Sequence, residues 1–272
     1  TNCTVDNCTL KIEGNVGNIL YLNVYNIQDF PSYVAGPWGP IPSGPVNTYN
    51  KFINNRIYGE EGSGISIGIM VEGEYNIIEN NTLYKSSIST SMGASGSNNN
   101  IYRGNTLLNG ASLIAQAKSI VYNNNVSGSL TTGADSVAYN NSVVGALTVA
   151  AGANVYNNTA ASLKTSGANS IIEENIINGT VTIGHKNTTF TNNNVSGLVT
   201  VNADENRIIN NTIITAGDNT VDLKAKKNNN VTGNILYAKE LTGDESVKFS
   251  DASNIVKDNF PVVANVTVEA TD

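Results

Sequence analysis

Charge is scarce in this 272-residue chain, and arginine is the scarcest charged residue. Only 14% of the residues are charged, against roughly a quarter in an average globular protein. The three arginines are Arg56, Arg103 and Arg207, and the formal net charge is -7. Binding to a nucleic acid needs clustered Lys and Arg that meet the phosphate backbone. The composition therefore argues against a nucleic-acid partner.

Long apolar runs, histidine and cysteine are also scarce. The chain contains no run of 18 or more apolar residues, so we expect no membrane insertion by this segment. The single histidine, His185, is far in sequence from the two cysteines, Cys3 and Cys8, and no zinc site is expected. Cys3 and Cys8 are five residues apart. They predict either a local disulfide, which would imply an oxidising compartment, or two free thiols.

What the sequence does contain is a repeated phrase, Asn-Asn-x-(Ile/Leu/Val), with degenerate copies between the clear ones. The spacing between copies is 17 or 18 residues in the middle of the chain and larger toward both ends. A fixed period of this kind is the signature of a solenoid. Aligned on the second Asn, the phrase falls at positions 55, 81, 105, 124, 141, 158, 175, 193, 211, 234 and 259.

The residues between the copies favour β structure. The segment 171–183 is rich in β-branched residues, and Gly or Asn interrupts the chain too often for an amphipathic helix. A repeat of 17 or 18 residues has room for about three short strands and their turns. The sequence therefore predicts an all-β fold over residues 1–260, a single-stranded right-handed parallel β-helix of about 11–13 rungs.

Side-chain parity within a strand predicts the direction of each residue of the phrase. If the apolar residue points inward, the second Asn does too, and the first Asn faces water. The inward Asn side chains are expected to form a hydrogen-bonded ladder along the rod. A recurring glycine two places after the apolar residue is expected to turn a corner with positive φ. These glycines are Gly59, Gly128, Gly145, Gly179 and Gly197.

The period is interrupted in two places, which we expect to be loop insertions. Residues 30–45 hold five of the six prolines and the only tryptophan, and proline cannot donate to a strand ladder. Residues 85–100 form a second, Ser/Gly/Asn-rich interruption. Residues 261–272 follow the last repeat as a linker, or as the start of whatever comes next.

Two groups of side chains are candidates for binding. Phe30, Tyr33 and Trp38 in the first insertion predict either an aromatic platform for a ligand or a cover for the end of the core. A group of carboxylates could converge on an acidic site or on a cation such as calcium, or be solvated turn residues. These carboxylates belong to Glu60, Glu61, Glu72 and Glu74. We find no convincing catalytic constellation, no metal-ligand motif and no need for a cofactor.

Asn-x-Ser/Thr sequons occur twelve times, a frequency that a chain this rich in Asn, Ser and Thr also reaches by chance. Six of them carry an Asn that parity places on the outside of the rod, where a glycan could be attached. These six are Asn80, Asn125, Asn140, Asn157, Asn194 and Asn210.

The repeats at 122–128 (Tyr-Asn-Asn-Asn-Val-Ser-Gly) and 208–213 (Ile-Ile-Asn-Asn-Thr-Ile) resemble those of adhesin-like surface proteins of methanogenic archaea. In that family, pectate-lyase-type β-helices are followed by Ig-like repeats, and residues 264–270 are similar to the first strand of such a repeat. The resemblance implies an extracellular location at the cell surface or wall. It also implies attachment to a glycan or protein of another cell, and it supplies no catalytic residues.

Three functions follow as hypotheses. The first is a non-enzymatic adhesin module, expected to be a monomeric part of a larger multidomain protein. The second is a polysaccharide lyase or hydrolase that uses the four glutamates. The third is a purely structural spacer in the cell wall, which would bind no ligand.

Overall fold

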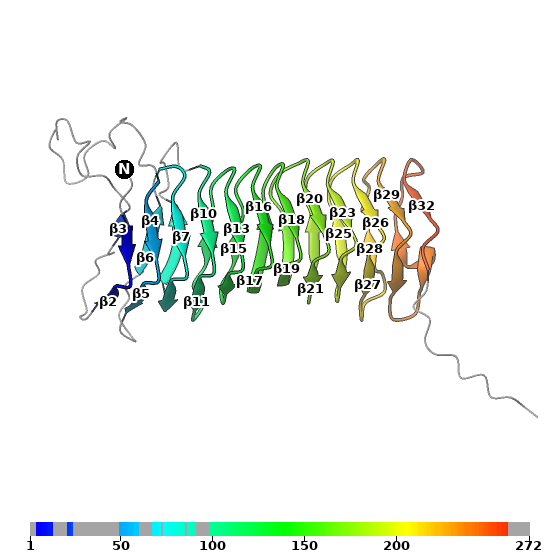
Figure 1. Cartoon of the computed structure of the whole chain (residues 1–272). Helices are drawn as coiled ribbons and strands as arrows, with labels where there is room; N and C mark the ends of the chain where they lie inside the picture. Colours follow the sequence, from blue (N-terminus) through cyan, green and yellow to red (C-terminus); the bar gives the residue numbers. More distant parts are fainter. Residues whose placement is uncertain are drawn as a thin grey trace, which may run out of the picture.

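The computed structural model describes residues 4–12, 21–23, 49–59, 67–71, 73–84, 86–90 and 98–260, and the structural statements below concern these residues. They form short parallel strands that coil into a straight rod (Figure 1). The one helical element described is the 3-10 turn η2, Gly243–Ser246. No helix in the described part of the chain is long and apolar enough to cross a membrane. The predicted parallel β-helix is confirmed.

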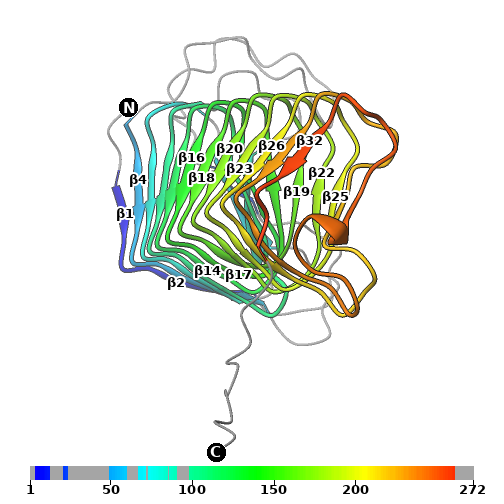
Figure 2. The same ribbon diagram turned by 90° about the vertical axis from the view of Figure 1, so that its right-hand side faces the viewer.

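Each rung contributes one strand to each of three faces, and successive rungs lie over one another in Figure 2. The coil is right-handed, as crossovers between parallel strands usually are. Face 1 is a sheet of twelve parallel strands, which gives a rod on the order of 50 Å long at the usual strand spacing. Its strands are β1 (Thr4–Asp6), β4 (Lys51–Ile53), β7 (Ile77–Glu79), β10 (Ile101–Arg103), β13 (Ile120–Tyr122), β16 (Val137–Tyr139), β18 (Asn154–Tyr156), β20 (Ile171–Glu173), β23 (Thr189–Thr191), β26 (Arg207–Ile209), β29 (Asn230–Thr232) and β32 (Ile255–Lys257).

Faces 2 and 3 are joined where two long strands bend from one face to the other. Face 2 comprises β2 (Thr9–Ile12), β5 (Arg56–Gly59), β8 (Thr82–Tyr84), β11 (Thr106–Leu108), β14 (Asn125–Val126), the first parts of β17 (Ser142–Val149) and β19 (Thr159–Thr165), β21 (Ile176–Ile177), β24 (Asn194–Val195), β27 (Thr212–Ile214) and β30 (Ile235–Tyr237). Face 3 comprises β3 (Tyr21–Asn23), β6 (Ile67–Val71), β9 (Ser86–Thr90), β12 (Leu113–Ile114), β15 (Leu130–Thr131), the last parts of β17 and β19, β22 (Val181–Ile183), β25 (Val199–Val201), β28 (Val221–Asp222) and β31 (Val247–Lys248).

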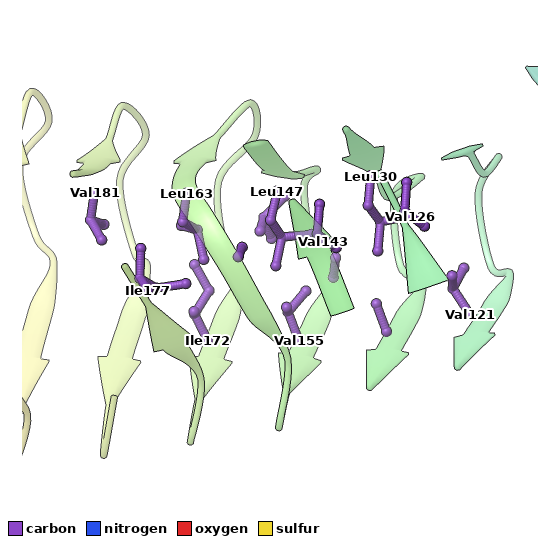
Figure 3. Packing of buried hydrophobic residues seen from close by; sticks show 14 of the residues in the cluster. Val121, Val126, Leu130, Val143, Leu147, Val155, Leu163, Ile172, Ile177 and Val181 are labelled. Atoms are coloured by element: carbon purple, nitrogen blue, oxygen red, sulfur yellow. The ribbon is translucent and has the colours of Figure 1, made fainter. Parts of the chain in front are cut away.

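The core is filled by apolar side chains from all three faces of each rung. In one rung these are Val121 from face 1, Val126 from face 2 and Leu130 from face 3, each without exposed surface. Figure 3 shows the same arrangement repeated in the following rungs. Full burial of such a side chain stabilises the fold by about 1.5–3 kcal/mol. Because each rung exposes its apolar residues at both ends, only stacking can bury them.

The second Asn of each phrase forms the predicted ladder, which is confirmed as an inward column. In the rung of Asn124, its backbone N–H and its Nδ2 both donate to Asn141 Oδ1, at 3.0 and 2.9 Å. Nδ2 also donates to the carbonyls of Tyr102 and Tyr122, at 2.9 and 3.0 Å. The other members repeat the bonds to the next Asn and to a carbonyl of the preceding rung. The column consists of Asn55, Asn81, Asn105, Asn124, Asn141, Asn158, Asn175, Asn193, Asn211, Asn234 and Asn259.

Both ends of this column have their own partners. At the start, the Cys8 N–H donates to Asn55 Oδ1 at 3.0 Å, so Cys8 occupies the place of the second Asn in an earlier rung. At the other end, Asn259 donates from Nδ2 to Asp244 Oδ1 at 2.6 Å and from its backbone N–H at 3.1 Å. A carboxylate therefore accepts the last donors of a column of aligned amides.

The first Asn of each phrase is exposed, as predicted, but the physical reason differs from strand parity. It sits at a corner in the left-handed region, with φ between 53° and 56° in the clear copies. Asn tolerates this region better than other residues with a Cβ. Gly104 and Gly233 take the same place in degenerate copies, with φ of 64° and 69°. The phrase is therefore a corner followed by a core position.

A second corner lies five residues earlier, before each face 1 strand, and it was not predicted. Residues with positive φ at this corner include Tyr49, Asn99 and Asp135. The residue after the corner is buried and forms a second inward polar column, for example Asn206 N–H to Asn229 Oδ1 at 2.9 Å. The column contains Asn50, Asn76, Asn100, Ser119, Ser136, Ser170, Thr188, Asn206, Asn229 and Asn254, and Ala153 interrupts it.

The prediction that the recurring glycines turn corners with positive φ is wrong. Gly128, Gly145, Gly179 and Gly197 are absent from the glycines with positive φ. They are required because neighbouring rungs approach closely at the bend between faces 2 and 3. A Cβ on Gly197 would lie 2.6 Å from the carbonyl carbon of Gly179, which is closer than Cβ atoms approach backbone.

Part of the second predicted insertion, 85–100, belongs to the rod, and residues 91–97 lie outside the described residues. Ser86–Thr90 form β9, which pairs with β6 and β12 inside face 3 and buries Ile88. Residues 98–100 lead into β10, and Asn100 joins the second polar column. The insertion at 30–45 and the linker at 261–272 lie outside the described residues.

Candidate functional site

Most of the side chains predicted to bind a ligand lie outside the described residues. This holds for Phe30, Tyr33, Trp38, Glu60, Glu61 and Glu72. Glu74 is described and partly exposed, and its carbonyl accepts a hydrogen bond from the Tyr49 N–H at 3.3 Å. Across the described ranges, no three His, Cys, Asp or Glu side chains are grouped so that they could hold a metal ion. The acidic site and its calcium stay predictions.

Cys8 is exposed, and its thiol lies 3.4 Å from the Asp6 carbonyl. Cys3, its predicted partner in a disulfide, lies outside the described residues. The predicted choice between a disulfide and two thiols therefore stays open for this pair.

The six predicted sequon asparagines are all exposed. Asn125 and Asn194 point outward from face 2, in β14 and β24. Asn80, Asn140, Asn157 and Asn210 sit at the corner with positive φ instead. Asn140 and Asn157 belong to consecutive rungs, so two glycans there would compete for the same space.

The most distinctive outer surface is a patch on face 1, which we call the tyrosine patch. It spans the outward residues of five neighbouring strands, β10, β13, β16, β18 and β20, shown side by side in Figure 1. One column along the rod is mainly aliphatic and the other is mainly aromatic with charged ends. The patch consists of Ile101, Ile120, Val137, Asn154 and Ile171 in the first column, and Arg103, Tyr122, Tyr139, Tyr156 and Glu173 in the second.

The strand register aligns the three tyrosines, which stack on one another. The ring centroids of Tyr122 and Tyr139 are 4.9 Å apart and those of Tyr139 and Tyr156 are 5.1 Å apart, with both interplanar angles at 2°. An offset stack of this kind contributes about 0.5–1.5 kcal/mol per pair beyond burial. Because the rings cover one another's faces, the surface presents ring edges and hydroxyl groups. This favours contact with a flat partner over the stacking of a sugar ring on an open aromatic face.

Charge is confined to the two ends of the aromatic column. Arg103 donates from Nη2 to Glu79 Oε2 at 2.7 Å and from Nη1 to the Tyr122 hydroxyl at 3.0 Å. The hydrogen bond with Glu79 and then that with Tyr122 raise the pKa of Arg103, which is positive at all working pH values. Burial, followed by the neighbouring tyrosines, raises the pKa of Tyr139 above its usual value. The Tyr139 phenol therefore stays neutral, between the Arg103–Glu79 ion pair at one end of the column and Glu173 at the other.

On faces 2 and 3 of the same rungs, the outward residues are polar or aliphatic and none is aromatic. On face 3, the outward residues of the same rungs include Thr131, Thr148 and Lys164. On face 2 they include Asn125 and Ser142, although Val144 is 66% exposed. Beyond Glu173, face 1 itself becomes polar, with Thr189 and Thr191 in the next strand. The stack of three tyrosines beside aliphatic residues therefore distinguishes this patch, whereas exposed aliphatic residues such as Leu108, Ile114 and Ile176 also lie on the other faces.

The tyrosine patch was not predicted, although the sequence carries a signal for it. Tyr122, Tyr139 and Tyr156 each stand two places before the second Asn of consecutive 17-residue repeats. Identical aromatic residues at one repeat position predict a stacked column once the repeats are known to be rungs. Comparison of the chain with protein-family models, curated proteins and solved structures finds no match.

Proposed function

We propose that the chain is an extracellular adhesin module, a stiff rod that attaches to a surface component of another cell. The observation that supports this most strongly is the tyrosine patch, an apolar and aromatic surface with charged ends on face 1. Bounded apolar patches on soluble proteins mark interaction sites. The stacked, hydrogen-bonded core suits a rod that holds such a patch away from its own cell surface.

Two further features support the proposal. The repeats at 122–128 and 208–213 resemble those of surface adhesins of methanogenic archaea. The six exposed sequons suit a secreted chain, although a composition rich in Asn, Ser and Thr also produces them. The partner in this proposal is a glycan or a protein on another cell.

A cell-capture assay tests the proposal. Beads that carry the chain are mixed with intact cells, and the retained cells are counted. We expect retention to fall with Tyr139→Glu and to be unchanged with Thr182→Glu, a matched change at an outward position of face 3. Periodate treatment of the cells separates a glycan partner from a protein partner, which protease treatment removes. Equal retention by uncoated beads would reject an adhesin role.

The enzymatic alternative rests on Glu60, Glu61, Glu72 and Glu74. It predicts the release of oligosaccharides from acidic or neutral polysaccharides, and the loss of that release in Glu72→Ala. Measured release of this kind would replace the adhesin proposal. The structural spacer predicts neither release nor capture of cells, so the two assays together separate the three functions.

A further inference from the structure

The charged ends of the tyrosine patch are placed symmetrically about Tyr139. Arg103 lies two strands before Tyr139 and Glu173 lies two strands after it, in the same outward column. Tyr122 and Tyr156 occupy the positions between. A two-fold axis that passes through Tyr139, perpendicular to the rod and in the plane of face 1, therefore exchanges the positive end of the patch with the negative end.

We propose that the tyrosine patch binds a second copy of this chain, with the two rods antiparallel and face 1 against face 1. In this arrangement Arg103 of each copy meets Glu173 of the other, Tyr122 meets Tyr156, and the two Tyr139 residues meet at the axis. The contact is isologous, so both charged pairs form at once. The sequence alone predicts a monomeric part of a larger multidomain protein.

The orientation follows from the two columns of the patch. An antiparallel pair keeps each column opposite its own kind, so charges face opposite charges and aliphatic residues such as Val137 face one another. A parallel pair with the axis along the rod would place Arg103 opposite Ile101 and Glu173 opposite Ile171. That arrangement would bury the side chains of Arg103 and Glu173 against apolar surface without an opposite charge on the partner, which is costly. Electrostatic complementarity thus selects the antiparallel pair.

The surface chemistry fits this partner. Ile120 and Ile171 are 39% and 44% exposed, so each copy offers apolar area that pairing would remove from water. Arg103 is held in place by Glu79 and Tyr122 before any partner arrives, which reduces the entropy lost on binding. The five strands of the patch lie side by side along a straight rod (Figure 1).

For adhesion, the inference rests on the proposed function and deepens it by naming the partner. Rods that project from two facing cells approach each other antiparallel, and this is the orientation that the patch selects. The module would then recognise a second copy of this chain on the opposing cell.

Sedimentation of the 272-residue chain over a range of concentrations tests the pairing. We expect the wild type to form dimers. Glu173→Arg places Arg against Arg103, and Arg103→Glu places Glu against Glu173, so each is expected to weaken dimerisation at least about tenfold. The double variant Arg103→Glu/Glu173→Arg restores opposite charges and should recover dimers. Thr182→Arg on face 3 is the matched control and should dimerise like the wild type.

Cross-linking tests the axis. A bifunctional thiol reagent with a spacer of about 10 Å, the usual distance between packed sheets, should link two copies of Tyr139→Cys through residue 139 but should not link Thr182→Cys. Mass spectrometry of the linked peptides identifies the bond. Circular dichroism confirms that each variant is folded. A wild type that stays monomeric at all concentrations, or single charge variants that dimerise as well as the wild type, would overturn the inference. Cell capture without dimers would leave the adhesin proposal standing, and dimers without capture would reject that proposal alone.

Discussion

Replacing an asparagine of the inward column and an exposed asparagine beside it shows how much the column contributes to stability. Asn124 and Asn125 are neighbours in sequence, and the same change to Ala can be made at both. Asn124 is buried, and its Oδ1 accepts from the backbone N–H and Nδ2 of Asn105, at 3.0 and 2.9 Å. Its own Nδ2 donates to the Tyr102 carbonyl at 2.9 Å. Asn125 is exposed on face 2.

Asn124→Ala therefore strands the buried Asn105 N–H and removes the hydrogen bond from Nδ2 to the Tyr102 carbonyl. A stranded group costs about 1–3 kcal/mol and a lost hydrogen bond about 0.5–1.5 kcal/mol, so we expect a loss of about 1.5–4.5 kcal/mol in the free energy of unfolding. Asn125→Ala strands none of these groups and should change it by less than about 0.5 kcal/mol. Urea unfolding followed by circular dichroism measures both. Equal losses for the two variants would refute the reasoning that the ladder holds the rungs together.

Three further changes test other parts of the fold by the same assay. Gly197→Ala should destabilise by about 1–3 kcal/mol because its Cβ meets the backbone of the preceding rung. Gly217 should accept Ala, because a Cβ there would meet only Thr215 Oγ1, at 3.5 Å. The opposite order would contradict the close-approach explanation. Asn140→Ala should cost about 1–2 kcal/mol because its φ is positive, and Asn140→Gly should be almost neutral. At Asp222, burial opposes ionisation, but hydrogen bonds from Lys224 lower the pKa of the folded state below its usual value. The stabilisation from the Asp222 carboxylate is therefore present above about pH 4 and is lost as the pH falls. We expect the free energy of unfolding of Asp222→Asn to decline less steeply in acid than that of the wild type. An identical decline would contradict this role of Asp222.

The fold was predictable because one short sequence phrase repeats once in each rung. The phrase gives the period, and the apolar residue within it, such as Val126 or Val143, gives the core position. The inward direction of Asn124 was also predictable, because the residue two places later is apolar. Strand parity also predicted correctly that the first Asn is exposed. The actual reason is that the first Asn lies at a corner of the chain, where residues are exposed as well.

The second polar column was harder to predict because its members vary. Ser119, Thr188 and Asn206 occupy the same place in different rungs, so no single residue type marks the column in the sequence. The glycines were misread because positive φ and a lack of space for a Cβ both select glycine. Only the distance between rungs, as at Gly197, separates these causes.

The tyrosine patch could not be predicted from residue types alone. Tyr139 has a recognisable position in its repeat, but the significance of Arg103 and Glu173 depends on their register relative to it. Register across rungs of 17 to 19 residues is fixed by the corners, which the sequence marks with several residue types. Once the strands are aligned, the symmetric placement of the two charges becomes visible.

Hydrogen exchange of the asparagine side chains tests most directly whether an inward amide ladder joins the rungs. In the ladder, the Nδ2 protons of residues such as Asn158 and Asn193 bond to the next amide and to buried carbonyls. We predict that these side-chain protons exchange with solvent as slowly as the backbone amides of face 1, when followed by NMR with assigned asparagine resonances. Exposed Asn125 and Asn194 provide the fast reference in the same spectrum. If the Nδ2 protons of the ladder exchange as fast as those of Asn125 and Asn194, the ladder does not exist in solution and the account is contradicted.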